Sequence, residues 1–202
     1  MILIYYFNFI FMDGIHNLIM IRKTIALLLF IILLPLYIFI SLLIYFIDGK
    51  PILFTQEKLG KNHKSFKMYK FRTMAVDTID IPSEKMINPS ITKTGYFLRQ
   101  SSLDEIPQLF NIINGEMRFI GPRPCMANNE EIIKNLRKNS GVHKLYPGIT
   151  GWAQVNGRDL NSFQKKVELD LYYMENKSFY LDLKILFLTF FVILFKQKDI
   201  KH

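Results

Sequence analysis

The chain has 202 residues, half of them hydrophobic and 21% charged, and its formal net charge is +9. This length suits one well-formed core and argues against a second full domain. The positive charge suits nucleic acid, an anionic membrane surface or a phosphorylated substrate. The single cysteine, Cys125, excludes an intramolecular disulfide and fits a reducing compartment.

Residues 1–21 form an apolar N-terminal extension that carries no charge before Asp13. Met12 and Met20 are alternative start sites within it, so the extension need not belong to the functional protein. We expect the organised part of the chain to begin at about residue 22.

The next segment, residues 25–47, is a run of 23 residues without a charge, long enough for a straight helix to cross a bilayer core. Pro35 stands near its middle and predicts a broken helix with two arms, each too short to span alone. Basic residues flank both ends of the run: Arg22, Lys23, Lys50, Lys58 and Lys61. Such flanks suit a helix that enters one leaflet and leaves on the same side, with an ordinary kinked transmembrane helix as the alternative.

Residues 51–74 are predicted to form a hairpin, with two extended runs around a turn at 60–63. The segment holds six basic residues with no acidic residue among them: Lys58, Lys61, Lys64, Lys67, Lys70 and Arg72. Those near the turn fit a solvated face. Lys70 and Arg72 alternate with apolar residues and share one face of the strand, so we expect them to bind phosphate.

The stretch "SSLDEIPQLF", residues 101–110, places Asp104 and Glu105 side by side ahead of Pro107. Proline is tolerated only in the first turn of a helix, and the apolar residues that follow recur at helical spacing. A helix is therefore predicted to begin near Asp104. On these residues alone, the two carboxylates serve either as helix caps or as catalytic groups.

Two further stretches are rich in turn-forming residues. "GPRP" holds Arg123 between prolines, which pre-orders a guanidinium for gripping a phosphate. "PGITGWAQVNGR", residues 147–158, contributes Gln154 and Arg158, and its glycines are expected to let backbone amides approach a ligand closely. The alternative for each stretch is a surface turn.

Residues 185–195 form an apolar run of eleven residues between Lys184 and Lys196. The run is too short to span a bilayer. It is predicted to be either a buried core helix or a helix in the headgroup plane.

Taken in order, these stretches resemble the bacterial sugar transferase family, the monotopic phosphoglycosyl transferases. The resemblance covers about residues 25–195 and rests on the proline-broken helix and on these motifs: "FTQEKLG", "YKFRTM", "GYFLRQSSLDEIPQLFN", "GEMRFIGPRP", "PGITGWAQVNGR", "ELDLYY" and "LDLKIL". Two departures from the family pattern are Leu34, where the family usually has Ser before the proline, and Tyr146, where it often has Arg. Neither touches Asp104 or Glu105.

The resemblance implies an α/β fold, mostly helical with a small β-hairpin or sheet. Residues 22–48 would form a re-entrant membrane helix, and residues 49–202 a cytoplasmic catalytic domain with interfacial helices. The implied location is the bacterial inner membrane, with the catalytic domain on its cytoplasmic face. The expected partners are a UDP-sugar, polyprenyl phosphate and inner-membrane lipid; a homodimer is left open, and no nucleic acid is expected.

The reaction implied is transfer of a sugar-1-phosphate from a UDP-sugar to polyprenyl (undecaprenyl) phosphate, which releases UMP and uses Mg²⁺. By motif position, Asp104 is the nucleophile that forms a covalent phospho-sugar intermediate and is also a metal ligand. Glu105 would position the metal or the acceptor phosphate. The residues expected to bind substrate are Lys70, Arg72, Arg99, Arg123, Gln154, Arg158, Asp170 and Asp182.

Two alternatives stand beside this mechanism. In one, the acceptor phosphate attacks directly and Asp104 only binds metal. In the other, the chain is a catalytically silent membrane protein that binds a nucleotide-sugar or acts as a scaffold.

Overall fold

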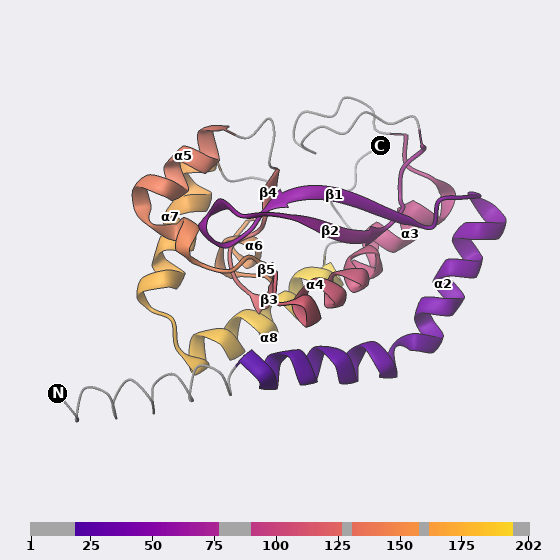
Figure 1. Ribbon diagram of the computed structural model, residues 1–202, viewed down its shortest axis with the longest axis horizontal. Helices are drawn as coiled ribbons and strands as arrows, with labels where there is room; N and C mark the ends of the chain where they lie inside the picture. Colours follow the sequence, from indigo (N-terminus) through magenta and orange to yellow (C-terminus); the bar gives the residue numbers. More distant parts are fainter. Residues whose placement is uncertain (1–18, 77–89, 127–130, 158–161, 196–202) are drawn as a thin grey trace.

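The computed structural model describes residues 19–76, 90–126, 131–157 and 162–195. A body of short helices surrounds a small sheet, and long apolar helices run along its outside (Figure 1). The described part is therefore mostly helical with a small β component, as the sequence predicts.

The first apolar segment is a broken helix. Helix Ile19–Ile32 and helix α2 (Leu34–Ile47) meet at a bend of 58°. Pro35 occupies the first turn of α2, where the missing N–H of proline leaves no helical bond unmade. The predicted break is confirmed, and its cause is the proline.

α2 packs one stripe of residues against the body and exposes the rest. Tyr37, Ile40 and Ile44 are buried in a cluster with Phe71 and Leu98. Among the described residues, no single helix is both long and apolar enough to cross a membrane, and only the bent pair meets those criteria when its two arms are taken together.

The predicted hairpin is confirmed. Strands β1 (Leu53–Leu59) and β2 (Ser65–Phe71) pair antiparallel around a 3₁₀ turn at Lys61–His63. Strand β4 (Cys125–Met126) adds to the other edge of β1. A separate parallel pair joins β3 (Arg118–Ile120) to β5 (Gly148–Thr150).

The two faces of β2 are used differently. Phe66 and Met68 belong to a core cluster with Ala26 of the first helix and with residues of helix α4 (Leu109–Asn114). Phe71 faces the other way, onto α2. Because side chains alternate along a strand, Lys70 lies on the same face as Phe66 and Met68.

The segment around the two carboxylates differs from the prediction in one respect. Residues Leu103–Gln108 form a 3₁₀ helix, η3, and the α-helix begins only at Leu109. Pro107 explains the difference, because it cannot donate a hydrogen bond and disfavours the α conformation in the residue before it. The carboxylates therefore lie in a tighter turn than an α-helical N-terminus.

The remaining helices complete the body. They are α3 (Lys93–Gln100), α5 (Glu131–Ser140), η4 (Val142–Lys144), α6 (Trp152–Val155), α7 (Phe163–Glu175) and α8 (Phe179–Phe195). α5 and α7 share a small core that includes Ile133 and Val167.

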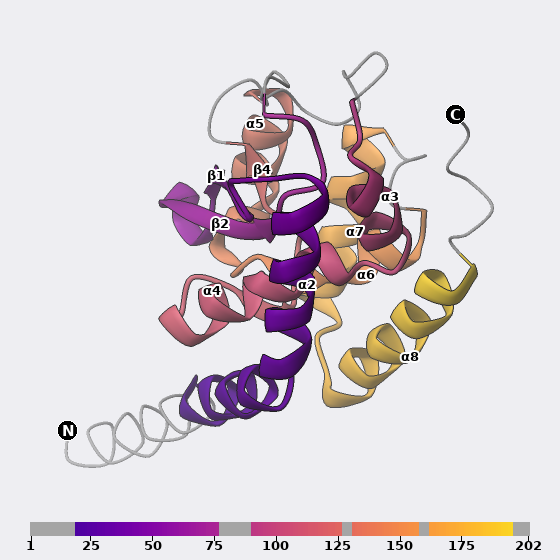
Figure 2. The same cartoon turned by 90° about the vertical axis from the view of Figure 1, so that its right-hand side faces the viewer.

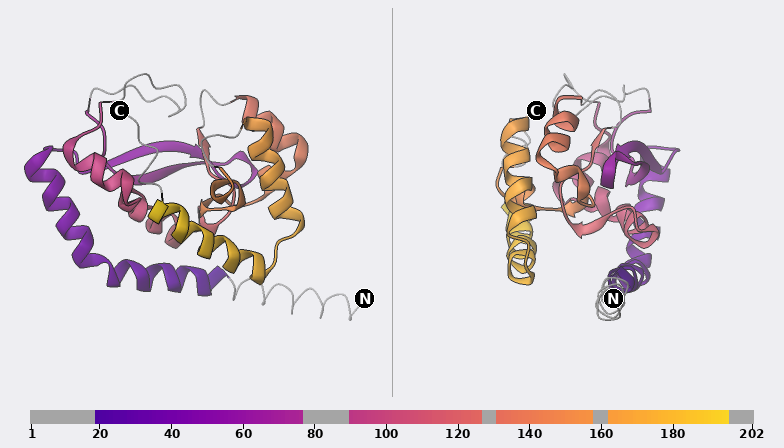
Figure 3. Two further views of the ribbon diagram at one scale, coloured as in Figure 1. Left: turned by 180° about the vertical axis from the view of Figure 1, so that it is seen from behind. Right: turned by 60° about the vertical axis from the view of Figure 1, so that its left-hand side comes forward.

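Helix α8 is apolar but largely uncovered. It has 17 residues, of which Leu181 and Ile185 are buried. Figures 2 and 3 show it along the same side of the body as helix Ile19–Ile32. Of the two predicted roles for this segment, the exposure of its apolar side chains favours an interfacial helix over a buried core helix.

Candidate active site

The carboxylates of Asp104 and Glu105, the dyad, lie in η3, which packs against β2. Each side chain is only 11% exposed. Ser102, directly before η3, has a φ of 56°, in the left-handed region that non-glycine residues seldom adopt. This conformation turns the chain from α3 into the dyad segment, and such strain is common at functional sites.

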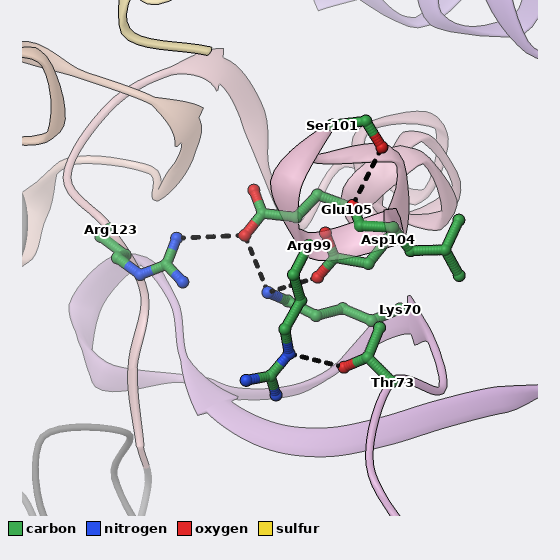
Figure 4. Close-up of polar contacts among 8 residues, drawn as sticks. Lys70, Thr73, Arg99, Ser101, Asp104, Glu105 and Arg123 are labelled. Atoms are coloured by element: carbon green, nitrogen blue, oxygen red, sulfur yellow. Dashed lines mark hydrogen bonds and ion pairs between the residues drawn. The ribbon is translucent and has the colours of Figure 1, made fainter. Parts of the chain in front are cut away.

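Two cations from distant parts of the chain meet the dyad. Lys70 Nζ donates to Glu105 Oε1 at 2.8 Å and lies 3.8 Å from Asp104 Oδ2. Arg123 Nη1 lies 3.4 Å from the same Glu105 oxygen. Figure 4 shows these side chains converging from β2, η3 and the loop that carries Arg123. The structure thus brings together four of the predicted site residues.

Arg99 supplies a third positive charge. It lies in the last turn of α3, and its Nε donates to Thr73 Oγ1 at 2.8 Å (Figure 4). Burial lowers the pKa of the Arg99 guanidinium, and the charge of Asp104 works against that shift. Since a guanidinium stays protonated even after such a shift, Arg99 adds a fixed charge within electrostatic reach of Asp104.

Asn111 fixes the dyad segment to the strand that carries Lys70. Its Oδ1 accepts from the Tyr69 N–H at 3.2 Å, and its Nδ2 donates to the Lys67 carbonyl oxygen at 2.7 Å. The residue is fully buried. These bonds satisfy backbone groups on the outer edge of β2, and they hold η3 and α4 in register with Lys70. The amide in the apolar sequence "LFNII" was a signal for this role.

Arg123 is positioned by a buried ion pair that the sequence analysis did not identify. Arg137 of α5 donates through Nη1 to the Arg123 carbonyl oxygen and through Nη2 to Asp170 Oδ2, both at 2.8 Å. Burial acts to lower the pKa of Arg137, but the negative charge of Asp170 and the hydrogen bond to it contribute to a net rise. Asp170 was expected to contact substrate, but the structure pairs it with Arg137, which acts on the loop of Arg123. Arg137 had no sequence signal, because it lies in a polar segment beside Lys138.

Arg72 has a structural role in this arrangement. β2 ends at Phe71, and the terminal nitrogens of Arg72 donate to the carbonyl oxygens of Asp48, Gly49 and Lys50 at 2.6–3.0 Å. The residue is 5% exposed. Binding a phosphate would break these bonds, so Arg72 fixes the end of α2 to the sheet and the structure does not bring it to the dyad.

The remaining predicted residues are placed as follows. Gln154 of α6 lines a pocket together with Glu105, and its Nε2 lies 3.5 Å from the Gly121 carbonyl oxygen. Asp182 of α8 accepts from the Tyr173 hydroxyl at 2.8 Å. Arg158 lies outside the described residues. The arginine that the family often has before "PGITG" is replaced by Tyr146, whose ring packs under the guanidinium of Arg118 at 4.4 Å.

The glycines of "PGITG" have a packing role that the sequence analysis did not predict. A Cβ on Gly148 would lie 2.1 Å from the Gly121 nitrogen, and one on Gly151 would lie 2.1 Å from the Gly121 oxygen. These glycines therefore let β5 approach the segment that leads to Arg123. The close approach that the structure shows is between two protein backbones.

The dyad also supplies carboxylate groups for the predicted Mg²⁺. Within the described ranges, no cluster of three or more His, Cys, Asp or Glu side chains is arranged to hold a metal ion. Mg²⁺ commonly binds through one or two carboxylates and completes its shell with water and substrate phosphates. Two adjacent carboxylates beside Lys70 and Arg123 fit that mode, with Asp104 and Glu105 as the residues that would hold the ion.

Comparison with known proteins places the chain in a family. The family model for bacterial sugar transferases matches residues 18–196. The chain therefore belongs to the bacterial sugar transferase family, as its ordered motifs predict, and its class is that of the phosphoglycosyl transferases.

Individual relatives of the chain are also named as sugar transferases or sugar-phosphate transferases. An uncharacterized sugar transferase, EpsL, of Bacillus subtilis is 44% identical over 70% of this chain and 69% of its own length. The UDP-glucose:undecaprenyl-phosphate glucose-1-phosphate transferase of Escherichia coli is 38% identical over 89% of this chain and 41% of its own length. The undecaprenyl-phosphate glucose phosphotransferase of Komagataeibacter xylinus is 36% identical over 82% of this chain and 34% of its own length. The chain thus spans well under half of the two longer relatives.

Proposed function

We propose that this chain transfers a sugar-1-phosphate from a UDP-sugar to a polyprenyl phosphate and releases UMP. The observation that carries the proposal is the buried dyad beside three cations, Lys70, Arg99 and Arg123. A nucleotide diphosphate needs such a set of positive charges, and a group transfer needs a nucleophile among them. The printed names of the two longer relatives, which both include undecaprenyl phosphate, support the choice of acceptor.

The donor binds through its diphosphate. Arg123 offers a planar fork suited to two phosphate oxygens, and Lys70 a compact point charge. Both cations are paired with Glu105 in the free site, so the diphosphate takes over partners that are already oriented. Mg²⁺, when held by the dyad, neutralises further phosphate oxygens.

Asp104 is the nucleophile in this proposal. A carboxylate oxygen attacks the phosphorus that carries the sugar, and the bond from that phosphorus to the bridging oxygen breaks. The bonding electron pair leaves with UMP. An oxygen of the acceptor phosphate then attacks the same phosphorus and returns the Asp104 carboxylate. Lys70 and Arg99 place positive charge beside the Asp104 carboxylate and orient it for attack.

The apolar surface supports a membrane location. Side chains such as Ile32, Phe46 and Phe187 are 64–78% exposed and lie on the broken helix and α8. Large apolar patches of this kind mark contact with lipid or with a partner. We propose that the broken helix is re-entrant and that the body lies on the cytoplasmic face of the bacterial inner membrane.

The nucleophile is tested by leaving out the acceptor. With UDP-glucose and Mg²⁺ alone, the wild type is expected to release at most one UMP per enzyme and to gain the mass of a hexose phosphate on the peptide that contains Asp104. Asp104→Asn should show neither signal, because an amide is a far poorer nucleophile. Glu131→Gln, which alters an exposed carboxylate on α5, is the matched control and should behave as wild type.

Other results would contradict the proposal at different levels. UMP release that needs acceptor and leaves no adduct after rapid acid quench would replace covalent catalysis by direct attack of the acceptor. No UMP from a broad panel of UDP-sugars, with acceptor present, would favour the silent binding or scaffold protein.

A further inference from the structure

A pocket with a volume of about 250 Å³ opens beside the dyad. One wall is formed by Leu29 and Leu33 at the bend of the broken helix, and the opposite wall by Val192 and Ile193 of α8. The two apolar helices, far apart in the sequence, thus enclose one space. Figures 2 and 3 show them on the same side of the body.

The pocket is apolar along its walls and polar where it meets the dyad. Glu105 lines it, and the same carboxylate pairs with Lys70 and Arg123. Gln154 also lines it, and its buried Oε1 has no hydrogen-bond partner among the residues that the structure describes. A ligand that fits this space therefore has an apolar chain and a charged head that reaches the cations.

The wall formed by α8 is fixed in place. Thr150 of β5 and Thr189 of α8 share a hydrogen bond of 2.6 Å between their hydroxyl groups, and both residues line the pocket. Thr189 also donates to the carbonyl oxygen of Ile185, which is fully buried. The distance between α8 and the dyad is thus set by specific contacts.

We propose that this pocket holds the first isoprene units of the acceptor, so that the acceptor phosphate lies at the dyad. The inference rests on the proposed function, and it adds a binding site for the lipid substrate. An apolar cavity of roughly 150 Å³ accommodates a benzene molecule, so this pocket has room for the start of the chain only. The rest of the chain leaves the pocket and continues into the surrounding lipid.

The lining argues against the nucleotide as occupant. A uracil ring calls for a stacking partner and for polar groups at its edge. Phe119 is the single aromatic residue among the described lining residues, and most of the others are aliphatic. Of the polar lining residues, Thr150 and Thr189 bond to each other, and Ser102, Glu105 and Gln154 are the rest. The donor nucleotide therefore reaches the cations from another direction.

The test fills the pocket from both sides. Two variants, Ile193→Trp and Leu29→Trp, place a bulky ring in the pocket. The controls are Leu194→Trp and Leu28→Trp, which change neighbouring residues on the same helices. These two residues do not line the pocket and are 51% and 53% exposed. We expect the KM for undecaprenyl phosphate to rise about tenfold or more in the two filling variants, because buried apolar contacts with the chain are lost. The KM for UDP-glucose and the acceptor-free UMP release should stay at wild-type values, as should all three quantities in the controls.

A second measurement locates the chain directly. An isoprenoid phosphate with a photoreactive diazirine in its first isoprene unit is expected to label peptides from 19–33 and 179–195 in the wild type, and to lose that label in Ile193→Trp. Labelling elsewhere, an equal rise of the acceptor KM in the control variants, or displacement of the probe by phosphatidylglycerol as readily as by undecaprenyl phosphate would overturn the inference. Absence of turnover in the wild type would instead contradict the proposed function itself.

Discussion

Arg137 shows how a single buried side chain sets the geometry of a site it does not enter. It lies between Asp170 and the Arg123 carbonyl oxygen, so it transmits the position of α7 to the loop that carries Arg123, which we propose binds phosphate. The pair is almost fully buried, with side chains 8% and 2% exposed. Its contribution therefore depends on both partners being present.

Removing one partner is expected to be costly. Asp170→Asn leaves the charge of Arg137 buried and uncompensated, and should lower the free energy of unfolding by about 3–5 kcal/mol. It should also raise the KM for UDP-sugar, because the Arg123 loop loses its support. Thermal or denaturant unfolding in detergent and donor kinetics measure the two effects.

Two comparisons make that prediction specific. Glu131→Gln breaks an exposed ion pair and should cost no more than about 1 kcal/mol. The double change Arg137→Met with Asp170→Leu should recover much of the stability and leave the donor KM raised. An Asp170→Asn protein as stable as wild type would show that the pair does not support the loop.

At the residue scale, the sequence predicted which residues belong to the site better than it predicted the groups that each of them contacts. Lys70, Glu105 and Arg123 meet as expected, because motifs place them on elements whose order fixes their approach. Arg72 and Arg137 could not be assigned in advance. Their roles depend on which carbonyl oxygens the folded chain brings within reach of a guanidinium, and no local pattern encodes that.

Among the elements, the close contact between β5 and the segment before Arg123 is the most sensitive to change. A Cβ at Gly148 would lie 2.1 Å from the Gly121 nitrogen and 2.5 Å from the Thr150 oxygen. Both are backbone atoms, and the Gly121 N–H donates to the Thr150 oxygen at 2.9 Å, so neither can move alone. The site loop and the parallel pair β3–β5 are thus one packed unit.

Gly148→Ala is expected to destabilise the protein by about 1–3 kcal/mol through overpacking, and to lower turnover because the loop of Arg123 shifts. Gly49→Ala is the control, since a Cβ there meets nothing within 4 Å and only its φ of 76° disfavours alanine. Its cost should stay near 1 kcal/mol with normal turnover. Unfolding curves and kcat for the two variants separate crowding from backbone strain. Equal effects of both changes on turnover would contradict the coupling.

The hairpin and the broken helix were predictable because each follows from a local rule: alternation around a turn, and proline in a helix. The 3₁₀ turn of the dyad was not predicted. The apolar spacing after Asp104 is helical, and it does not distinguish an α-helix that starts at residue 104 from one that starts at Leu109. Pro107 accounts for the later start at Leu109.

On the scale of the whole molecule, the uncovered apolar side chains gather on the broken helix and on α8. Among the described residues no single helix passes as a membrane span, and the broken helix passes only when its two arms are taken together. Sequence patterns identified both segments as apolar, and they identified each arm of the first segment and the whole of the second as too short to span a bilayer. They gave no sign that the two segments enclose a common pocket, because that depends on how the body folds between them.

The re-entrant course of the broken helix is open to direct measurement. In a Cys125→Ala background, cysteines placed at Lys23 and Lys50 should both react with a membrane-impermeant maleimide in inverted inner-membrane vesicles, and neither should react in intact spheroplasts. Lys165→Cys on α7, a side chain 55% exposed, marks the cytoplasmic body in the same assay. Labelling of the Lys23 site in spheroplasts, with the Lys50 site protected, would identify a spanning helix instead.

The shared oxygen of Glu105 has a consequence for selectivity among anions. Lys70 and Arg123 already hold a counterion in the free site, so an incoming anion gains only the difference between its own pairing and that of the carboxylate. An anion with one negative charge, or one that can contact only one of the two cations, gains little by this exchange. A diphosphate carries more charge and can contact both cations at once, so it can displace the internal carboxylate. In the proposed reaction UMP departs with one phosphate, and Glu105 can then pair with both cations again. Under that proposal the carboxylate sets a threshold that admits the donor and favours release of the product.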